Sequence, residues 1–245
     1  MSLTKDAIQQ IQETAIQPSN RVIQEGGRAF IIDNDGLSHE ILRESVTGIS
    51  LNTLTAMADF IKNLDRVPSE YEVPVLYLNI EDPHQVKLYT SLQSDNKRDE
   101  LAEAIAITPE ISFNTFKNVE DLVIELQAKY LPSDDRETLL KVLGNLKEEN
   151  VKNLGDDGVS QQVVIKQGVA SAANVKVPNP VSLAPFRTFH EVKQPESPFV
   201  FRMKEGGQGA LFEADGQGWK LAAIQNIKEF FKKELAGLDH VVILA

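Results

Sequence analysis

Apolar residues follow two different spacings along this chain, and the change of spacing divides it into elements. Between residues 50 and 64 apolar side chains recur every three or four positions, which places them on one face of a predicted helix. The same spacing predicts helices over residues 119–130, 134–146 and 219–235, and a shorter helix is expected over residues 100–107. The pattern therefore predicts four to five amphipathic helices.

Runs rich in Val, Ile, Leu, Tyr and Phe come in pairs that are separated by turn residues, which is typical of antiparallel hairpins. The predicted pairs are 28–32 with 37–42 around Asn34-Asp35-Gly36, 73–80 with 85–92, and 199–203 with 210–213. A terminal strand over residues 241–244 follows the last helix. Strands and helices do not alternate as in a parallel, doubly wound sheet. We therefore expect an α+β fold of mainly antiparallel hairpins packed with the helices.

The segment from Gly158 to Met203 combines strand-like alternation with several prolines, namely Pro178, Pro180, Pro185, Pro195 and Pro198. Proline has no N–H to donate to a neighbouring strand, so it is disfavoured in the middle of a sheet. The segment is therefore predicted to form edge strands and fixed corners.

No repeat and no long flexible linker divides the chain. Residues 1–25 are polar and rich in glutamine, with weak helical spacing before Pro18, and we interpret them as a polar N-terminal arm. Such an arm can lie on a neighbouring subunit, although a frayed terminus is the more common explanation. Residues 26–245 are predicted to form a single composite α+β domain, since 42% hydrophobic residues suffice for a sizeable core.

The chain contains no cysteine, which excludes disulfides, thiolate metal sites and thiol nucleophiles. Its formal net charge of -11 opposes non-specific binding to nucleic acid and to anionic membranes. The first twenty residues lack the apolar core of a secretory signal, and no window reaches the length of a membrane span. We therefore expect a cytoplasmic protein that does not associate with membranes.

The usual catalytic and metal-binding motifs are missing. The four histidines, His39, His84, His190 and His240, lie too far apart for a local metal pair, so we predict no metal and no cofactor. No Gly-x-Ser-x-Gly elbow and no phosphate-binding loop occurs. Gly216 and Gly218 precede a helix, where an anion could bind, but Asp215 stands at the same place and is more simply a helix cap.

Cations and aromatic residues alternate in the proline-rich region. The candidate binding surface consists of Phe186, Arg187, His190, Lys193, Arg202 and Lys204. This pattern would suit a stacking platform for single-stranded nucleic acid, but a strand with an aromatic core face produces it as well, and the negative charge of the chain favours the core. The stacking platform requires that Phe186 and Phe199 are exposed together on the face that carries Arg187 and Arg202, whereas the core strand requires that they are buried.

Three long segments carry a resemblance to known proteins, namely GNLKEENVKNLGDDGVSQQVVIKQGVA, VKVPNPVSLAPFRTFHEVKQPESPFVFRM and ALFEADGQGWKLAAIQNIKEFF. They resemble the YfdQ-like family of uncharacterised bacteriophage and prophage proteins, and the resemblance covers about residues 50–236. Gln217 stands where the family often has glycine. The resemblance implies a bacterial cell that carries a phage genome, and it implies no activity or catalytic residues.

These observations favour a phage accessory protein that acts by binding or by homo-oligomeric self-assembly rather than by catalysis, because exposed strand edges are templates for pairing. A phage or host protein is the other partner to consider. The alternative function is a nucleic-acid-binding accessory of phage replication or recombination. An enzyme that uses converging carboxylates on a small molecule is the third hypothesis, and it would need a pocket with two acids facing inward.

Overall fold

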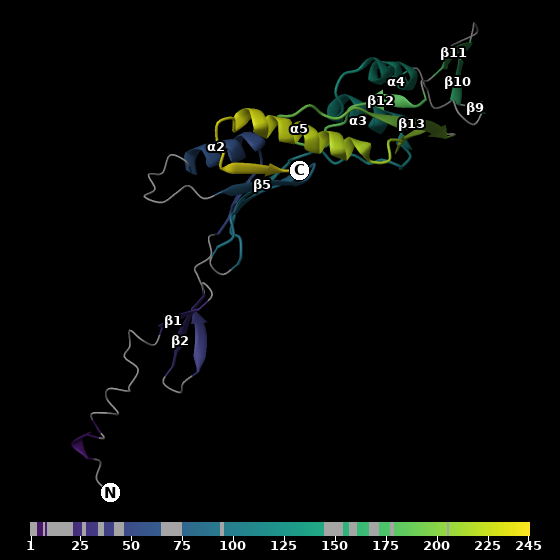
Figure 1. The fold of residues 1–245 in the computed structure, drawn as a ribbon. Helices are drawn as coiled ribbons and strands as arrows, with labels where there is room; N and C mark the ends of the chain where they lie inside the picture. Colours follow the sequence, from purple (N-terminus) through teal and green to yellow (C-terminus); the bar gives the residue numbers. More distant parts are fainter. Residues whose placement is uncertain are drawn as a thin grey trace.

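The computed structural model has an α+β fold in which helices pack on mostly antiparallel sheets (Figure 1). Three sheets are antiparallel throughout, and the fourth is mixed. The fold class expected from the sequence is confirmed. The structure describes residues 4–6, 8, 22–25, 28–33, 37–41, 47–64, 75–93, 96–144, 154–156, 161–166, 172–176, 179–204 and 206–245.

A mixed five-stranded sheet forms one half of the main body. Its strand order is β15-β5-β6-β7-β4, and β15 and β4 pair in parallel with their neighbours. The strands are β4 (Ile49–Leu51), β5 (Leu76–Asp82), β6 (Gln85–Thr90), β7 (Glu100–Ile105) and β15 (Val241–Leu244). β5 and β6 form the predicted second hairpin, and the predicted terminal strand is present.

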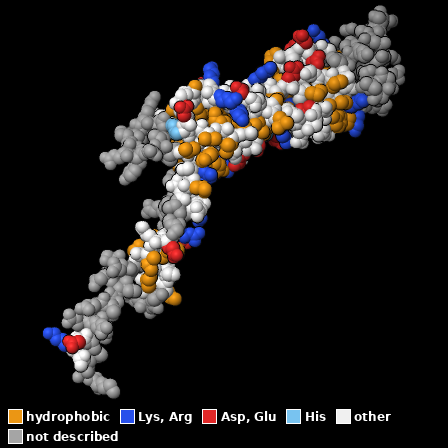
Figure 2. All heavy atoms as spheres, viewed as in Figure 1, with side chains coloured by type: hydrophobic (Ala, Val, Ile, Leu, Met, Phe, Trp, Pro, Cys, Tyr) orange, Lys and Arg blue, Asp and Glu red, His pale blue; other side chains and the backbone are white. Residues whose placement is uncertain are grey.

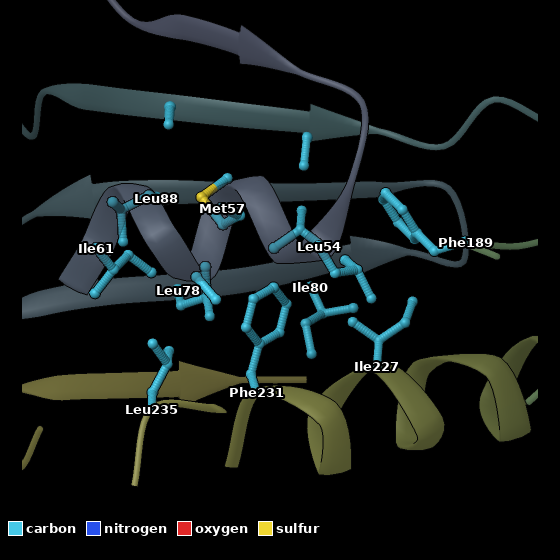
Figure 3. Packing of buried hydrophobic residues seen from close by; sticks show 14 of the residues in the cluster. Leu54, Met57, Ile61, Leu78, Ile80, Leu88, Phe189, Ile227, Phe231 and Leu235 are labelled. Carbon is cyan, nitrogen blue, oxygen red and sulfur yellow. The ribbon is translucent and has the colours of Figure 1, made fainter. Parts of the chain in front are cut away.

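Two helices cover one face of this sheet, α2 (Leu54–Leu64) and α5 (Gly218–Glu234). Alternate residues of β5 and β6 point toward them and are fully or almost fully buried. Figure 3 shows Phe231 and Ile227 of α5 facing Leu78 and Ile80 of β5, with Met57 of α2 close by. The ion pair between Lys62 and Glu234, 2.9 Å long, joins the two helices at the surface and lowers the pKa of Glu234.

A four-stranded antiparallel sheet forms the other half, with the order β12-β13-β14-β8. Its strands are β8 (Lys117–Asn118), β12 (Val181–Leu183), β13 (Ser197–Lys204) and β14 (Gln208–Glu213). The helices α3 (Val119–Lys129) and α4 (Asp134–Gly144) pack on one of its faces and enclose a second hydrophobic core. The third predicted hairpin is confirmed, since β13 and β14 pair over six residues.

Two small antiparallel sheets complete the described chain. β1 (Val22–Glu25), β2 (Arg28–Ile32) and β3 (Ser38–Ile41) form one of them, which contains the predicted first hairpin and which we call the N-terminal sheet. In Figure 1 it lies apart from the five-stranded sheet. The other contains β9 (Leu154–Asp156), β10 (Gln161–Lys166) and β11 (Ala172–Lys176).

The helix predicted over residues 100–107 is wrong, because residues 100–105 form β7. Ala, Glu and Leu favour helices, yet the segment pairs with β6 on one side and with β4 on the other. Ala102 and Ala104 are fully buried beneath α2, and their small side chains allow this helix to pack closely. Burial alternates along β7, but Leu101 and Ile105 on the other face are also apolar, so the sequence has no clear alternation of apolar and polar residues.

The expectation of edge strands holds for only part of the proline-rich region. β12 lies at an edge, directly after Pro180, but Pro198 belongs to β13, which has neighbours on both sides. Paired residues of β13 and β14 begin only at Phe199, so Pro198 lies at the end of this ladder, and its carbonyl oxygen still accepts a hydrogen bond from the N–H of Ala214. Pro178 lies outside the described residues.

The predicted helix boundaries shift by a few residues. Ser50 and Leu51 belong to β4, so the first helix begins at Leu54 instead. The cap of α4 is Ser133, whose Oγ accepts a hydrogen bond from the N–H of Arg136. The last two residues of the helix predicted over 134–146 lie outside the described residues. α5 ends one residue before the predicted Leu235.

Part of the predicted arm is described. Lys5, Asp6 and Ile8 are helical, and residues 22–25 form β1. The boundary at residue 26 and the single domain stay predictions. None of the described helices is long and apolar enough to span a membrane.

Candidate functional site

The loop between β12 and β13 connects the two halves of the body. Its fold depends on Gln194, whose buried side-chain oxygen accepts hydrogen bonds from the N–H groups of Arg187 and Thr188. The amide nitrogen of Gln194 donates to the carbonyl of Phe189, so one side chain closes the turn. Thr188 donates its hydroxyl to the carbonyl of Pro83 in the β5–β6 turn. The loop is therefore fixed to both halves, and it places Arg187 between them.

Arg187 is only 5% exposed and contacts four side chains. Its Nη1 donates to Glu213 at 2.9 Å, and its Nη2 donates to the hydroxyl of Ser197. The guanidinium lies 4.1 Å from the centre of the Trp219 ring and 5.6 Å from that of Phe199. Its Nε has no hydrogen-bond partner among the described residues.

Burial lowers the pKa of Arg187 to about 10, while the charges of Glu213 and Asp215 oppose this shift. The guanidinium therefore keeps its charge at neutral pH. The hydroxyl of Tyr130 interacts electrostatically with that charge. It is buried without a partner in the described chain, and burial raises its pKa. The junction thus holds a permanent buried cation.

Trp219 lies in the first turn of α5 and is the single tryptophan of the chain. The carboxylate of Asp215 accepts hydrogen bonds from the N–H groups of Gln217 and Trp219, at 2.9 and 3.0 Å. The proposed capping role of Asp215 is confirmed. The Trp219 side chain is 8% exposed, its ring meets His84 edge to face, and its Nε1 has no partner among the described residues.

These side chains line a pocket of about 350 Å³ at the junction of the two halves, which we call the junction pocket. Its polar lining consists of His84, Thr108, Arg187, Glu213, Gln217 and Lys220, and Trp219 adds the indole N–H. Pro109, Ile111 and Phe113 supply an apolar wall. The pocket therefore combines hydrogen-bond donors, one carboxylate and an apolar surface.

A second pocket of about 410 Å³ lies beside α3. It contains two acids, Asp121 and Glu125, as the enzyme hypothesis requires, but both are engaged. Glu125 is 8% exposed and pairs with Lys117 at 2.7 Å and with Lys129 at 3.5 Å. Asp121 accepts from the side chain of Asn118, which caps the helix. These contacts fix α3 to its surroundings and present no unpaired group, so we regard this pocket as structural.

The residues of the predicted binding surface do not lie on one face. Phe199 is fully buried and Arg187 is nearly so, which excludes the stacking platform that would have needed both exposed. Phe186 is half-buried, and its ring lies 5.2 Å from that of the exposed His190. The interpretation of Phe199 as a core residue is confirmed.

The other three predicted cations are separate from Arg187. Alternation along β13 places Arg202 and Lys204 on the face opposite to Phe199. The Lys204 ammonium lies 3.9 Å from the centre of the Phe116 ring. Lys193 is exposed, and its carbonyl accepts a hydrogen bond from Asn226 of α5. Of the six predicted residues, only Arg187 lines the junction pocket.

Other candidates from the sequence have structural contacts. Within the described chain, no group of three or more acidic or histidine side chains could hold a metal ion. His39 pairs with Asp33 in the N-terminal sheet. Asp82 accepts from the N–H of His84, and Asp135 accepts from that of Ser182. Two pairs of adjacent acids that the enzyme hypothesis could also use, Glu148-Glu149 and Asp156-Asp157, have no described side chains.

The roles of Glu213, Gln194 and Trp219 were not predicted from the sequence. Glu213 belongs to a predicted hairpin, and Trp219 belongs to a predicted amphipathic helix. In the sequence, Asp215 and the glycines beside it indicate the start of α5. Nothing in the sequence indicates that Arg187 lies over the same turn. Gln217, where the resembled family often has glycine, has a left-handed backbone with φ of +68°.

This turn supplies a direct test of backbone strain. Gly216 has φ of +59°, and a Cβ on either Gly216 or Gly218 would meet no atom within 4 Å. Gly216→Ala should therefore lower the free energy of unfolding by about 1 kcal/mol, from strain alone. Gly218→Ala, with an ordinary backbone at the first position of α5, is the matched control and should be neutral or slightly stabilising. Equal effects in chemical denaturation would contradict the turn geometry.

Comparison with known proteins adds no relative. The chain matches no protein-family model, no curated protein and no solved structure.

Proposed function

We propose that this protein acts by binding and by homo-oligomeric self-assembly, not by catalysis. The observation that carries the proposal is the N-terminal sheet, in which none of the described strand residues is buried. Small sheets of this size need a covered apolar face to be stable in water. A surface supplied by another copy of the chain would provide that cover.

The N-terminal sheet has apolar side chains on both faces. The register places Val22, Ile31 and Ile41 on one face, each between 43% and 45% exposed, and Ile23 and Phe30 on the other. Figure 2 shows hydrophobic side chains at the surface of this part of the chain. Exposed apolar groups at this density are typical of an interaction surface.

A second copy is the partner that the sheet geometry favours. Among the described strands, β1 and β3 each have a neighbour on one side only, so both lie at edges of this sheet. An edge strand can pair antiparallel with the same strand of another copy, which gives a closed two-fold contact. Pairing of edges and covering of a face both remove apolar side chains from water.

The test is the mass of the full-length protein at micromolar concentration, measured by size-exclusion chromatography with light scattering. The wild-type chain should form a discrete oligomer, and the double variant Ile31→Thr/Ile41→Thr should dissociate to monomer. Threonine keeps the β-branched shape that strands favour, so the sheet itself should persist. Ile107→Thr, at a residue 68% exposed outside this sheet, is the control and should leave the oligomer intact. A monomeric wild-type protein would overturn the proposal.

The biological setting that we propose is the cytoplasm of a bacterial cell that carries a phage genome. Its support is the resemblance of the three long segments, including residues 175–203 and 210–231, to the YfdQ-like family. A phage or host protein is the alternative partner of the N-terminal sheet. Nucleic acid is disfavoured, because the net charge is -11 and Phe199 and Arg187 are too buried to form the stacking platform that the sequence pattern would also have suited.

A further inference from the structure

The junction pocket contains hydrogen-bond donors that lack acceptors. Trp219 Nε1 and Arg187 Nε are each buried without a partner among the described residues, and both side chains are more than nine-tenths buried. A buried donor that makes no hydrogen bond destabilises a protein, and few native donors are left in that state. Both residues line the junction pocket, and a small shift of either side chain would bring its donor within reach of an acceptor bound there.

We propose that the junction pocket binds a small organic carboxylate, with its charged group toward the indole and guanidinium nitrogens and its hydrocarbon part against the apolar wall. This site is independent of the N-terminal sheet. Its ligand is a small molecule, not a partner chain.

The charges around the pocket favour an anion. Arg187 is a permanent cation, and Lys220 lines the pocket without an ion pair in the described chain. The start of α5 adds the positive end of a helix dipole. Asp215 offsets part of this dipole, because its carboxylate accepts hydrogen bonds from the N–H groups of the helix turn, so the attraction depends mainly on Arg187 and Lys220.

One carboxylate in the lining limits the charge of the ligand. Glu213 pairs with Arg187 Nη1 and also lines the pocket, so a doubly charged phosphate would lie beside a negative side chain. A singly charged carboxylate is repelled less. It can still accept hydrogen bonds from two donors at once.

The volume and the wall set the size and character of the rest of the ligand. About 350 Å³ lies near the lower end of the range for ligand pockets. Pro109, Ile111 and Phe113 form an apolar surface that suits a short aliphatic chain or a single aromatic ring. The ligand class is therefore a small carboxylic acid with an apolar body.

The tryptophan makes binding directly measurable. Because Trp219 is the single tryptophan and lies in the pocket, its fluorescence reports on this site alone. Titration of the full-length chain with benzoate, phenylacetate and hexanoate up to millimolar concentrations should give a saturable change with at least one acid. Benzyl alcohol, which has the ring without the charge, should give none, and inorganic phosphate should bind more weakly than the acid.

Two variants test the geometry. Lys220→Gln should weaken the binding of the acid about tenfold, since it removes a charged hydrogen bond. Lys228→Gln, on the same helix but outside the pocket lining, is the matched control and should have no effect. Trp219→Phe keeps a ring but removes the N–H, and calorimetry should show a similar loss.

The proposal would be overturned by any of three results. No saturable signal with any of the three acids would mean that water satisfies the buried donors. Equal binding of benzoate and benzyl alcohol would mean an apolar pocket without anion recognition. Unchanged affinity of the correctly folded Lys220→Gln protein would place the binding elsewhere.

Discussion

Phe231→Ala is expected to lower the free energy of unfolding by about 3–5 kcal/mol. The Phe231 ring is fully buried between α5 and the five-stranded sheet, where it faces Leu78 and lies near Ile227 (Figure 3). Removing the ring loses the favourable free energy of transferring it from water into the core. It also leaves a cavity that the surrounding side chains can only partly fill. Chemical denaturation followed by circular dichroism measures the loss.

The control is Leu221→Ala on the same helix, at a side chain 74% exposed, which should change stability by less than about 0.5 kcal/mol. A comparable effect of both variants would contradict the packing of α5.

The same experiment tests the single-domain prediction. If both cores unfold together, circular dichroism and the fluorescence of Trp219 at the junction should show one coincident transition in Phe231→Ala. Separate transitions would assign the two cores to two domains.

Glu213→Gln should destabilise the protein by about 3 kcal/mol, because it leaves the charge of Arg187 buried without its counterion. Arg187 is 5% exposed, whereas the Glu213 side chain is 26% exposed. Arg187→Met removes the other partner. Its electrostatic destabilisation should be smaller than that of Glu213→Gln, because water can hydrate the carboxylate that remains. Urea denaturation of both variants measures this asymmetry.

A double-mutant cycle separates the pair from the packing around it. Arg187→Met/Glu213→Gln should be less destabilised than the sum of the two single variants, because no buried charge remains. The pair Lys62–Glu234, with side chains 34% and 36% exposed, is the comparison. Removing either of its partners should have a much smaller effect, because solvent screens this exposed pair. Additive effects at Arg187 and Glu213 would contradict the buried ion pair.

The elements that the sequence predicted well are those in which local and tertiary signals agree. The stripe that contains Met57 and Ile61 predicted α2, and turn residues between two apolar runs predicted the β5–β6 hairpin. Asp215 was correctly identified as a cap, because a side-chain oxygen two residues before an N–H can reach it without help from the rest of the fold.

The errors occur where neighbours in space overrode local preference. Residues 100–105 have helix-forming side chains but are held as a strand by partners on both edges. Pro198 was expected at an edge and lies in a central strand, because its position near the strand end leaves few hydrogen bonds to lose. Arg187 was predicted as a surface cation, since the chain gives no sign that Glu213 and Trp219 lie beside it.

By itself, the sequence determined the α+β class, most helices and hairpins, and the exclusion of cysteine chemistry. These follow from periodicity, turn residues and composition, which act over a few neighbouring positions. The tertiary structure alone decided the junction pocket, because its side chains come from five separate segments: the β5–β6 turn, the segment between β7 and β8, the loop before β13, the end of β14 and the start of α5. Their convergence depends on how two hydrophobic cores pack around one loop, and no short-range pattern carries that information.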